Sequence, residues 1–537
     1  MNRSTTETHI VTGKIFPSVQ QKHIFENLFS DCCSACNCAV CLVHKQIEAL
    51  ESCDEYIVAQ SQIQSLSKEI EQLEDKKKKT KNEEKKAIEL ELDKKKVQRK
   101  SAYAIKKVLI QAYGLTKYSL DPLLRNTKDK YSIPSDLFRG TILNRTASAI
   151  DAYFWANGEN ISFKKRKDFL TLQNASNISA LRFYNNKLVY FKNNKPVFEI
   201  PVKFANDEYT QESLSRRVKY PILVRYKKKG EWCYEVQLAV EGPAPMKRNE
   251  YGKIRHTINS GRAGLDVGTQ TIAFVTEDAV LLEELYPQDS YLEDEKRVAS
   301  LQQKIDNCRR ENNPNKYNEN GTCKKKPEDK TPWVISKRQA KLEAEIEDIC
   351  RKQAKRRKLS HRTLVNRLIG FADTVIVEDN DIKGWQEKKP REQDENGKEK
   401  SRKKFGHSVG HNAPGLFVSL LDQNLKTNNH PGVIKVKAKD LRPTQYNHTT
   451  DTYEKHDLSE RVVYVNGRPY QRDLYSAYKL LYVNKAGTGY DKKALKENFA
   501  HFTELHDAEI LRHKGMNNPK SMGIDILLAY LEMAQAA

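Results

Sequence analysis

The chain has 537 residues, more than one hydrophobic core normally serves, so we expect two to four domains. Lys and Arg number 93 against 71 Asp and Glu, a net charge of +22 that favours a polyanionic partner. The N-terminus, MNRSTTETHI, lacks an apolar signal core, and no run of about 18 apolar residues occurs, which argues against a membrane protein and predicts a soluble, cytoplasmic one.

The N-terminal part is predicted to be one strand followed by helices. Residues 9–16, HIVTGKIF, alternate as a strand does, and after Pro17 a helix is expected to open at Ser18. Helices then dominate to about residue 155. Apolar residues at 63, 66, 70 and 73, and again at 88, 92 and 97, are separated by KKKKTKNEEKK, which predicts an antiparallel helical hairpin.

Five cysteines lie within SDCCSACNCAVCLV, at positions 32, 33, 36, 38 and 41. Four of them form two CxxC pairs, Cys33 with Cys36 and Cys38 with Cys41, and the single residue between the pairs leaves no loop to wrap a tetrahedral metal ion. We expect a helix over 30–49, with Ser30 or Asp31 as its N-cap, in which the thiols serve as small apolar side chains. A metal site and a redox role are the alternatives.

Residues 158–262 are rich in β-forming segments and predict a barrel-like β domain. Basic clusters with neighbouring aromatic residues interrupt these segments, a combination typical of phosphate contact and base stacking. The alternative for any one cluster is a solvated charged turn. The candidate nucleic-acid-binding residues here are Lys164, Lys165, Arg166, Lys167, Arg216, Arg217, Lys227, Lys228 and Lys229.

From residue 263 the pattern becomes a β-hairpin followed by alternating helices and strands, which predicts an α/β unit. A helix expected over 336–358 ends in RKQAKRRK. Its cations can stabilise the helix C-terminus or follow a phosphate backbone, and the candidates are Arg351, Lys352, Lys355, Arg356 and Arg357. Residues 386–404 are polar and of low complexity, so we expect a mobile loop.

Three acidic residues occur where the hydrophobic pattern predicts burial: Asp266 in GLDVGT, Glu378 at the end of TVIVE, and Asp473 at the start of a helix. Two strands and one helix could bring them to one sheet edge, where carboxylates suit Mg²⁺. Two Mg²⁺ ions could then support phosphodiester cleavage. GLDVGT is also similar to the phosphate loop of actin-like ATPases and sugar kinases, although a second such loop is not evident, and a purely structural role is a third possibility.

The sequence resembles the TnpB nucleases of insertion sequences and the compact type V CRISPR effectors related to them. GLDVGTQTIAF, VIVEDNDIKGW and RPYQRDLYSAYKLL resemble the three RuvC motifs of this family in order. FGHSVGHNAPGLFVSLL, TQYNHTTDTYEKHDLSER, GKIFPSVQQKHIFENLF and FKKRKDF resemble further family segments.

The resemblance implies a multidomain α+β and α/β protein: an RNase H-like RuvC domain, a β-barrel wedge domain and an inserted helical recognition domain. The implied boundaries are 1–17 and 158–262 for the wedge, 18–157 for recognition, 263–440 and 471–537 for RuvC, and 441–470 for a target-binding insertion. Asp266, Glu378 and Asp473 would be the catalytic acids that hold two Mg²⁺ ions, with Asp507 as the alternative third acid.

The function implied is an RNA-guided, Mg²⁺-dependent DNA endonuclease. Its partners would be a guide RNA, either an omega RNA or a crRNA with tracrRNA, and double-stranded target DNA with a short flanking motif. It would work in the prokaryotic cytoplasm, at the nucleoid when bound to DNA. A guide-independent, structure-selective metal nuclease and a cleavage-deficient RNA-guided binding protein are the alternatives.

One departure from the family concerns zinc. Many relatives carry paired CxxC motifs between the second and third acids, but here no cysteine follows Cys350. His448 and His456 in that span are expected to be ordinary polar residues, and no structural zinc is predicted.

Overall fold

The computed structural model describes residues 6–80, 83–156, 158–324, 331–387, 405–457 and 459–536. The loop predicted over 386–404 lies, from residue 388 on, outside this set. The chain is a mixed α and β protein that divides into two compact units, Met1–Lys227 with Glu231–Pro245 and Lys228–Gly230 with Met246–Ala537. None of the described helices is long and apolar enough to cross a membrane.

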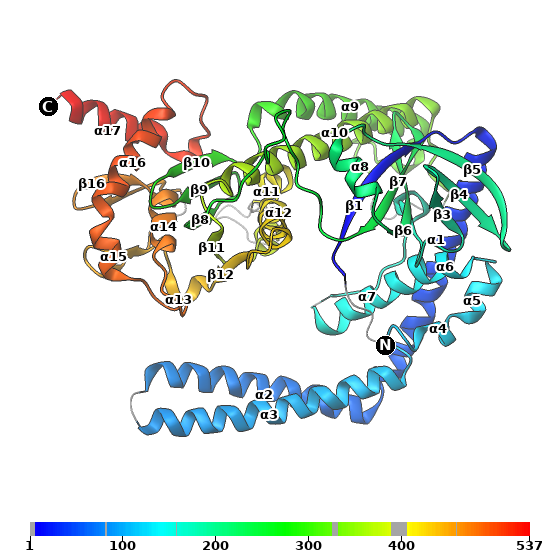
Figure 1. Ribbon diagram of the computed structural model, residues 1–537, viewed down its shortest axis with the longest axis horizontal. Helices are drawn as coiled ribbons and strands as arrows, with labels where there is room; N and C mark the ends of the chain where they lie inside the picture. The colour runs from blue at the N-terminus through cyan, green and yellow to red at the C-terminus, as the bar shows by residue number, and fades with distance from the viewer. Residues whose placement is uncertain are drawn as a thin grey trace. The chain divides into compact units, whose positions relative to one another are not determined.

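The first unit combines helices with one curled sheet (Figure 1). The sheet has the order β2-β6-β7-β1-β5-β4-β3, so the N-terminal strand lies in its middle. A barrel was expected, but the structure shows a curled sheet whose outer strands are β2 and β3. The elements are β1 (Thr8–Ile15), α1 (Val19–Glu51), α2 (Asp54–Lys79), α3 (Glu83–Ala112), α4 (Leu120–Leu123), α5 (Arg125–Lys130), α6 (Ser135–Leu137), a π-helical turn (Phe138–Leu143), α7 (Asn144–Trp155), β2 (Thr171–Gln173), β3 (Leu181–Tyr184), β4 (Lys187–Lys192), β5 (Lys195–Lys203), α8 (Glu208–Leu214), β6 (Val218–Lys228) and β7 (Glu231–Glu241).

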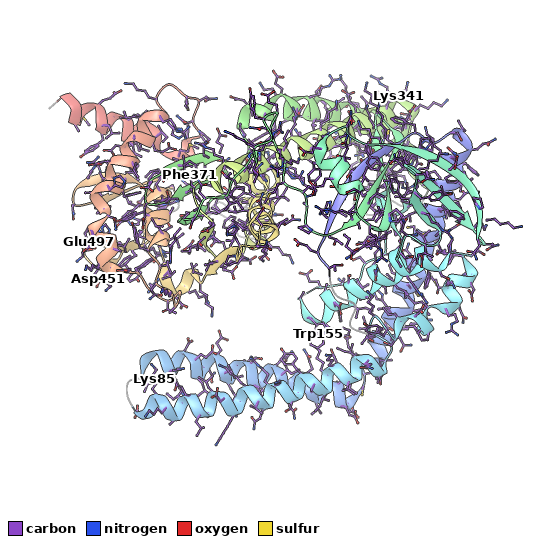
Figure 2. The ribbon with its side chains drawn as sticks, in the orientation of Figure 1. Lys85, Trp155, Lys341, Phe371, Asp451 and Glu497 are labelled. Carbon is purple, nitrogen blue, oxygen red and sulfur yellow. The ribbon has the colours of Figure 1, made fainter. Side chains whose placement is uncertain are left out.

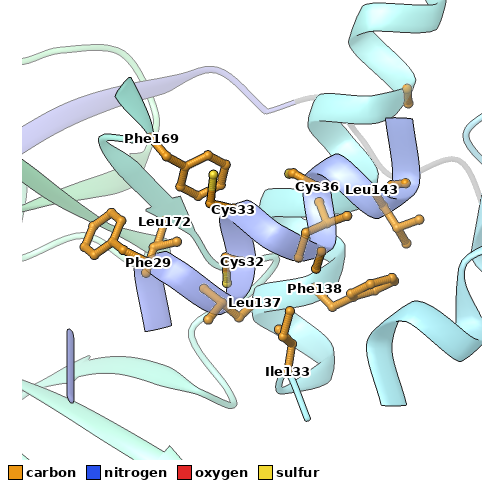
Figure 3. Close-up of a cluster of buried hydrophobic side chains, with 14 of the residues drawn as sticks. Phe29, Cys32, Cys33, Cys36, Ile133, Leu137, Phe138, Leu143, Phe169 and Leu172 are labelled. Atoms are coloured by element: carbon orange, nitrogen blue, oxygen red, sulfur yellow. The ribbon is translucent and has the colours of Figure 1, made fainter. Parts of the chain in front are cut away.

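The prediction of a separate helix that begins at Ser30 is wrong, because this segment belongs to the longer helix α1. It begins at Val19, where the Ser18 and Gln21 side chains form a capping box, and runs unbroken through Ser30 to Glu51. Its cysteines face the core only in part. Cys32, Cys33 and Cys36 are buried among Phe29, Leu137, Phe138 and Phe169 (Figure 3), whereas Cys38 is half-buried and Cys41 is exposed.

The expected hairpin is formed by α2 and α3 (Figure 1). Ile70, Leu73 and Leu92 form its apolar seam, and Lys95 pairs with Glu69 across it at 2.7 Å. Val97, expected in the seam, is instead exposed. Lys85, near the tip, also lies in solvent (Figure 2).

The second unit is built around a five-stranded sheet of order β10-β9-β8-β11-β12, in which β8, β11 and β12 run parallel and β9 and β10 form antiparallel pairs. The long helix α10 begins where predicted, with Ser336 as its N-cap, but continues past Lys358 to Leu368. The elements are β8 (Arg262–Val267), β9 (Thr271–Val275), β10 (Val280–Glu284), α9 (Leu292–Asn312), α10 (Lys337–Leu368), β11 (Thr374–Glu378), α11 (Gly406–Asn412), α12 (Pro414–Thr427), β12 (Val433–Val436), α13 (Ala438–Leu441), β13 (Tyr446–Asn447), β14 (Thr452–Tyr453), β15 (Val462–Val465), β16 (Arg468–Gln471), α14 (Arg472–Leu481), α15 (Lys492–Glu497), α16 (Phe499–Arg512) and α17 (Ile524–Ala536).

Candidate active site

Two of the three acids lie on neighbouring parallel strands. Strands β8 and β11 pair with Gly264 opposite Ile376 and Leu265 opposite Val377, so the same register puts Asp266 level with Glu378. Side chains alternate along a strand, which turns Asp266 to the same face as Gly264, and Glu378 to the same face as Ile376. Neighbouring strands lie about 4.8 Å apart, so both carboxylates share one face at one end of the sheet.

Helix α14 covers this face and carries the third acid. A Cβ on Gly264 would lie 1.9 Å from the Ala477 carbonyl oxygen, so only glycine lets the helix pack this closely on β8. Ile376 packs in a buried cluster with Leu480 of the same helix. Asp473 is one helical turn before Ala477, towards the strand end that carries Asp266.

The three carboxylates influence one another electrostatically. Asp266 is 8% exposed, and its pKa is raised well above the usual value by burial and then by the negative charges of Asp473 and Glu378. Burial also raises the pKa of Glu378, against the opposing effects of the Asn380 amide and the Lys479 charge. A buried cluster of like charges is unfavourable unless a cation or protons neutralise it.

Lys479 is a buried cation beside the acids, but it is engaged elsewhere. Its Nζ donates to the Tyr446 carbonyl oxygen at 2.6 Å and lies 3.7 Å from the centre of the Tyr475 ring. Burial lowers the pKa of Lys479 well below its usual value, although Asp266 and Glu378 act in the opposite direction. Within the described part of the chain, Asp266 Oδ2 is buried without a hydrogen-bond partner.

This donor set fits a divalent cation. It offers hard carboxylate oxygens, of which Asp266 Oδ2 is unpartnered among the described residues, while Asp473, with 13% of its side chain exposed, pairs with Arg472 at 3.1 Å. The ligand atoms of the three acids do not all lie within 4.8 Å of one another. Among the described residues, those of Glu295, His407 and His411 do.

Asp507, the alternative third acid, lies in a different environment. It is on α16, where it pairs with Arg468 and its Oδ1 is 3.1 Å from His506 Nδ1. Asp507 is half-buried within this ion pair, and it is not among the groups that shift the pKa of Asp266.

The basic candidates of the first β-rich region are largely in solvent. Lys164, Lys165, Arg166 and Lys167 are all exposed, beside an exposed Phe163. Arg217, Lys228 and Lys229 are exposed too.

Two further candidates in this region contact the protein itself. Arg216 pairs with Glu212 at 2.6 Å and donates to the Pro243 carbonyl oxygen. Lys227 lies 5.5 Å from the centre of the Trp232 ring.

Most of the basic candidates of α10 contact groups of the protein, either on α10 itself or on neighbouring elements. Arg351 and Lys352 pair with Asp348, and Arg356 pairs with Asp294 of α9. Arg357 donates to the carbonyl oxygens of Gly410 and His411 at 2.8 and 3.0 Å. Lys355 is exposed. These contacts give four of the five residues a structural role within the second unit.

Sequence reasoning missed the histidines beside the sheet. His407 and His411 approach Glu295 from α11, and their spacing of one helical turn was the available signal. His448, in contrast, is buried, with Nδ1 2.6 Å from the Tyr475 hydroxyl, and His456 lies 3.3 Å from Glu460.

No family model matches the chain, and no curated protein matches it. Among solved structures, the chain is similar to one described as "Cryo-EM structure of CRISPR-Cas12f Ternary Complex", with 12% sequence identity, over 86% of this chain and 81% of that one. The TM-score of 0.23 is below the level at which two chains share a fold, so this match assigns neither fold nor activity.

Proposed function

We propose that the protein is an RNA-guided DNA endonuclease in which Asp266, Glu378 and Asp473 hold the catalytic Mg²⁺ ions. The observation that carries the proposal is the convergence of these three carboxylates on one covered face of the sheet, with Asp266 Oδ2 unpartnered among the described residues. The strand order, with an antiparallel hairpin joined to three parallel strands, supports an RNase H-like assignment for this sheet.

In this proposal the residues of the chain have distinct tasks. A pair of Mg²⁺ ions, when bound, would activate water and stabilise the leaving oxygen of a phosphodiester. Asp266 and Glu378 provide ligands fixed by the rigid sheet, while Asp473 provides one from the first turn of helix α14. Lys479 is buried near Asp266 and Glu378 and donates to the Tyr446 carbonyl oxygen. The exposed Lys164–Lys167 cluster would contact nucleic-acid phosphates.

RNA guidance rests on the sequence resemblance, and cleavage rests on the acids, so one experiment tests both. The full-length chain is expressed from its native locus, co-purifying RNA is sequenced, and matched duplex DNA is offered with Mg²⁺. We expect a discrete RNA and cleavage that needs it. Branched DNA cut without RNA would instead support the guide-independent nuclease.

Two isosteric variants test the acids. Asp266→Asn and Glu378→Gln should each lower the cleavage rate at least about 100-fold, since lost metal ligation is worth several kcal/mol, while RNA binding stays within about twofold. Asp306→Asn is the matched control, because Asp306 pairs with Arg309 on the surface of α9. Wild-type cleavage by either acid variant would disprove the site assignment.

A further inference from the structure

Three potential metal ligands meet between α9 and α11. The Nε2 atoms of His407 and His411 lie 2.9 and 2.8 Å from the same oxygen, Glu295 Oε1. The two histidines are four residues apart on α11, so their rings lie on one helix face, with centroids 4.5 Å apart. All three donor atoms lie within 4.8 Å of one another.

Neighbouring aromatic rings fix the orientation of this group. The His411 ring stacks on Tyr291 at 4.8 Å and 17°, and Tyr291 stacks in turn on Tyr286 at 5.5 Å. Tyr291 is buried and precedes Glu295 by one helical turn, where its carbonyl oxygen accepts from the Glu295 backbone N–H at 2.9 Å. Arg357 fixes the C-terminal end of α11 by donating to the carbonyl oxygens of Gly410 and His411.

The donor set has a definite chemical preference. Two imidazole nitrogens and one carboxylate oxygen suit Zn²⁺ and similar transition ions, whereas Mg²⁺ prefers oxygen ligands alone. Bonds of about 2.0–2.2 Å in a tetrahedral site place neighbouring ligand atoms about 3.4 Å apart. The present separations of 2.8 and 2.9 Å therefore need to open by only about half an ångström.

We propose that Glu295, His407 and His411 form a binding site for a divalent transition ion, Zn²⁺ in the first instance. The side chains of Glu295 and His411 are 27% and 25% exposed and that of His407 is 73% exposed, which leaves an entry path and room for water as a fourth ligand. The bound ion ties α11 to α9.

The bound ion would act close to the sheet that carries Asp266 and Glu378. The Zn²⁺ site itself does not depend on the proposed function. Ser408, between the two histidines, donates from Oγ to the Thr269 carbonyl oxygen at 3.2 Å. Thr269 lies in the turn that follows Asp266 and β8. An ion that fixes α11 therefore also steadies this turn.

Metal titration of the full-length, untagged chain tests the site. The protein is stripped with a chelator, kept in excess Mg²⁺ to occupy hard oxygen sites, and titrated with Zn²⁺ against a chromophoric chelator. We expect wild type to bind one Zn²⁺ that His407→Ala, His411→Ala and Glu295→Gln each bind at least about tenfold more weakly. The thiols, common to all variants, contribute equally to each titration.

A matched control is His430→Ala, because His430 lies 3.6 Å from Asp373 in another half-buried histidine–carboxylate pair of the same unit. It should leave Zn²⁺ binding unchanged. Zn²⁺ should also raise the Tm of wild type but not of His407→Ala, whose exposed side chain can be removed without unfolding the chain. Equal Zn²⁺ affinity and equal Tm shifts in wild type and the three ligand variants would overturn the proposal, whether or not the protein cleaves DNA.

Discussion

Asp473 and Asp507 both belong to the C-terminal part of the second unit, but their neighbours differ. Asp473 pairs with Arg472 at 3.1 Å and also acts electrostatically on Asp266, whereas Asp507 pairs with Arg468 and His506 and is not among the groups that act on Asp266. Burial acts to raise the pKa of Asp507, yet the hydrogen bonds from His506 and Arg468 hold it below the usual value. The folded state therefore favours an ionised Asp507, which is the behaviour of a structural ion pair.

This difference predicts opposite outcomes for the two asparagine variants. Asp473→Asn should lower the cleavage rate at least about 100-fold, because it removes a metal ligand, with little loss of stability, because relief of the repulsion between Asp473 and Asp266 offsets the lost pair with Arg472. Asp507→Asn should keep the rate within about threefold but lower the Tm, because Arg468 loses its anion. Cleavage assays and thermal denaturation of both variants check these outcomes. Loss of cleavage in Asp507→Asn alone would make Asp507, and not Asp473, the third catalytic acid.

The buried His448 allows a second prediction about a single residue, which concerns the stability of the protein at acid pH. Burial, with the charges of Lys479 and Lys496, lowers the pKa of His448 from 6.5 to about 4. The unfolded chain takes up its proton first, so this contribution to stability is present above pH 6.5 and is lost as the pH falls towards 4. Its size is on the order of 3 kcal/mol.

We therefore expect the Tm of the second unit to fall between pH 6.5 and 4 less steeply in His448→Gln than in wild type, whatever the starting Tm. His501→Gln, on the exposed surface of α16, is the control and should keep the wild-type slope. Thermal denaturation across this pH range gives the answer, and identical slopes for all three proteins would contradict it.

Residue patterns revealed the acids but not the histidines, for a physical reason. A carboxylate inside an apolar run, as at Asp266, is costly enough to stand out in one sequence. A pair of histidines one helical turn apart is common on helix surfaces, and Glu295 becomes its partner only when α9 and α11 pack together.

Packing between elements positions the third acid, and Gly264 is where this packing is most demanding. A Cβ there would lie 1.9 Å from the Ala477 carbonyl oxygen and 2.5 Å from the Leu481 nitrogen, both backbone atoms that cannot rotate away. Gly264→Ala should push α14 from β8 at a cost of about 3 kcal/mol.

The expected result is a lower Tm together with lost cleavage, because Asp473 moves with its helix. Gly410→Ala is the matched control, since a Cβ there meets no atom within 4 Å and alanine favours the helix. Thermal denaturation and cleavage assays of both variants distinguish them. An active, stable Gly264→Ala would show that the position of α14 on β8 is not decisive.

Local signals predicted where several elements begin better than where they end. The strand near residue 9, the opening of α1 at Ser18 and the start of α10 at Ser336 are confirmed, whereas α10 continues to Leu368, past its predicted end at Lys358. Ser30 and Asp31 are also residue types that cap helices. The helix nevertheless continues across them, because burial of the apolar side chains of Phe25, Phe29 and Cys32 on one helix face stabilises it more than a cap would. Sheet order, which depends on contacts distant in sequence, was not predictable from such local signals.

At the scale of the whole molecule, the net charge of +22 matters only through the cations that remain available. Arg351, Lys352, Arg356 and Arg357 are bound to groups of the protein, so a phosphate would have to compete with these groups for them. Each residue of the Lys164–Lys167 cluster, in contrast, is exposed. Nucleic-acid affinity should therefore depend on this cluster more than on α10.

Salt dependence measures this difference directly. Each phosphate contact contributes about 0.9 to the slope of log affinity against log salt for duplex DNA and about 0.7 for single strands. Replacing Lys164, Lys165, Arg166 and Lys167 together by Gln should flatten the slope by about 3 to 4 on duplex DNA, whereas Arg356→Gln should leave the slope as it is, because Arg356 already pairs with Asp294. If the quadruple variant keeps the wild-type slope while Arg356→Gln flattens it, the phosphates are bound by α10, and its ion pairs must open when nucleic acid arrives.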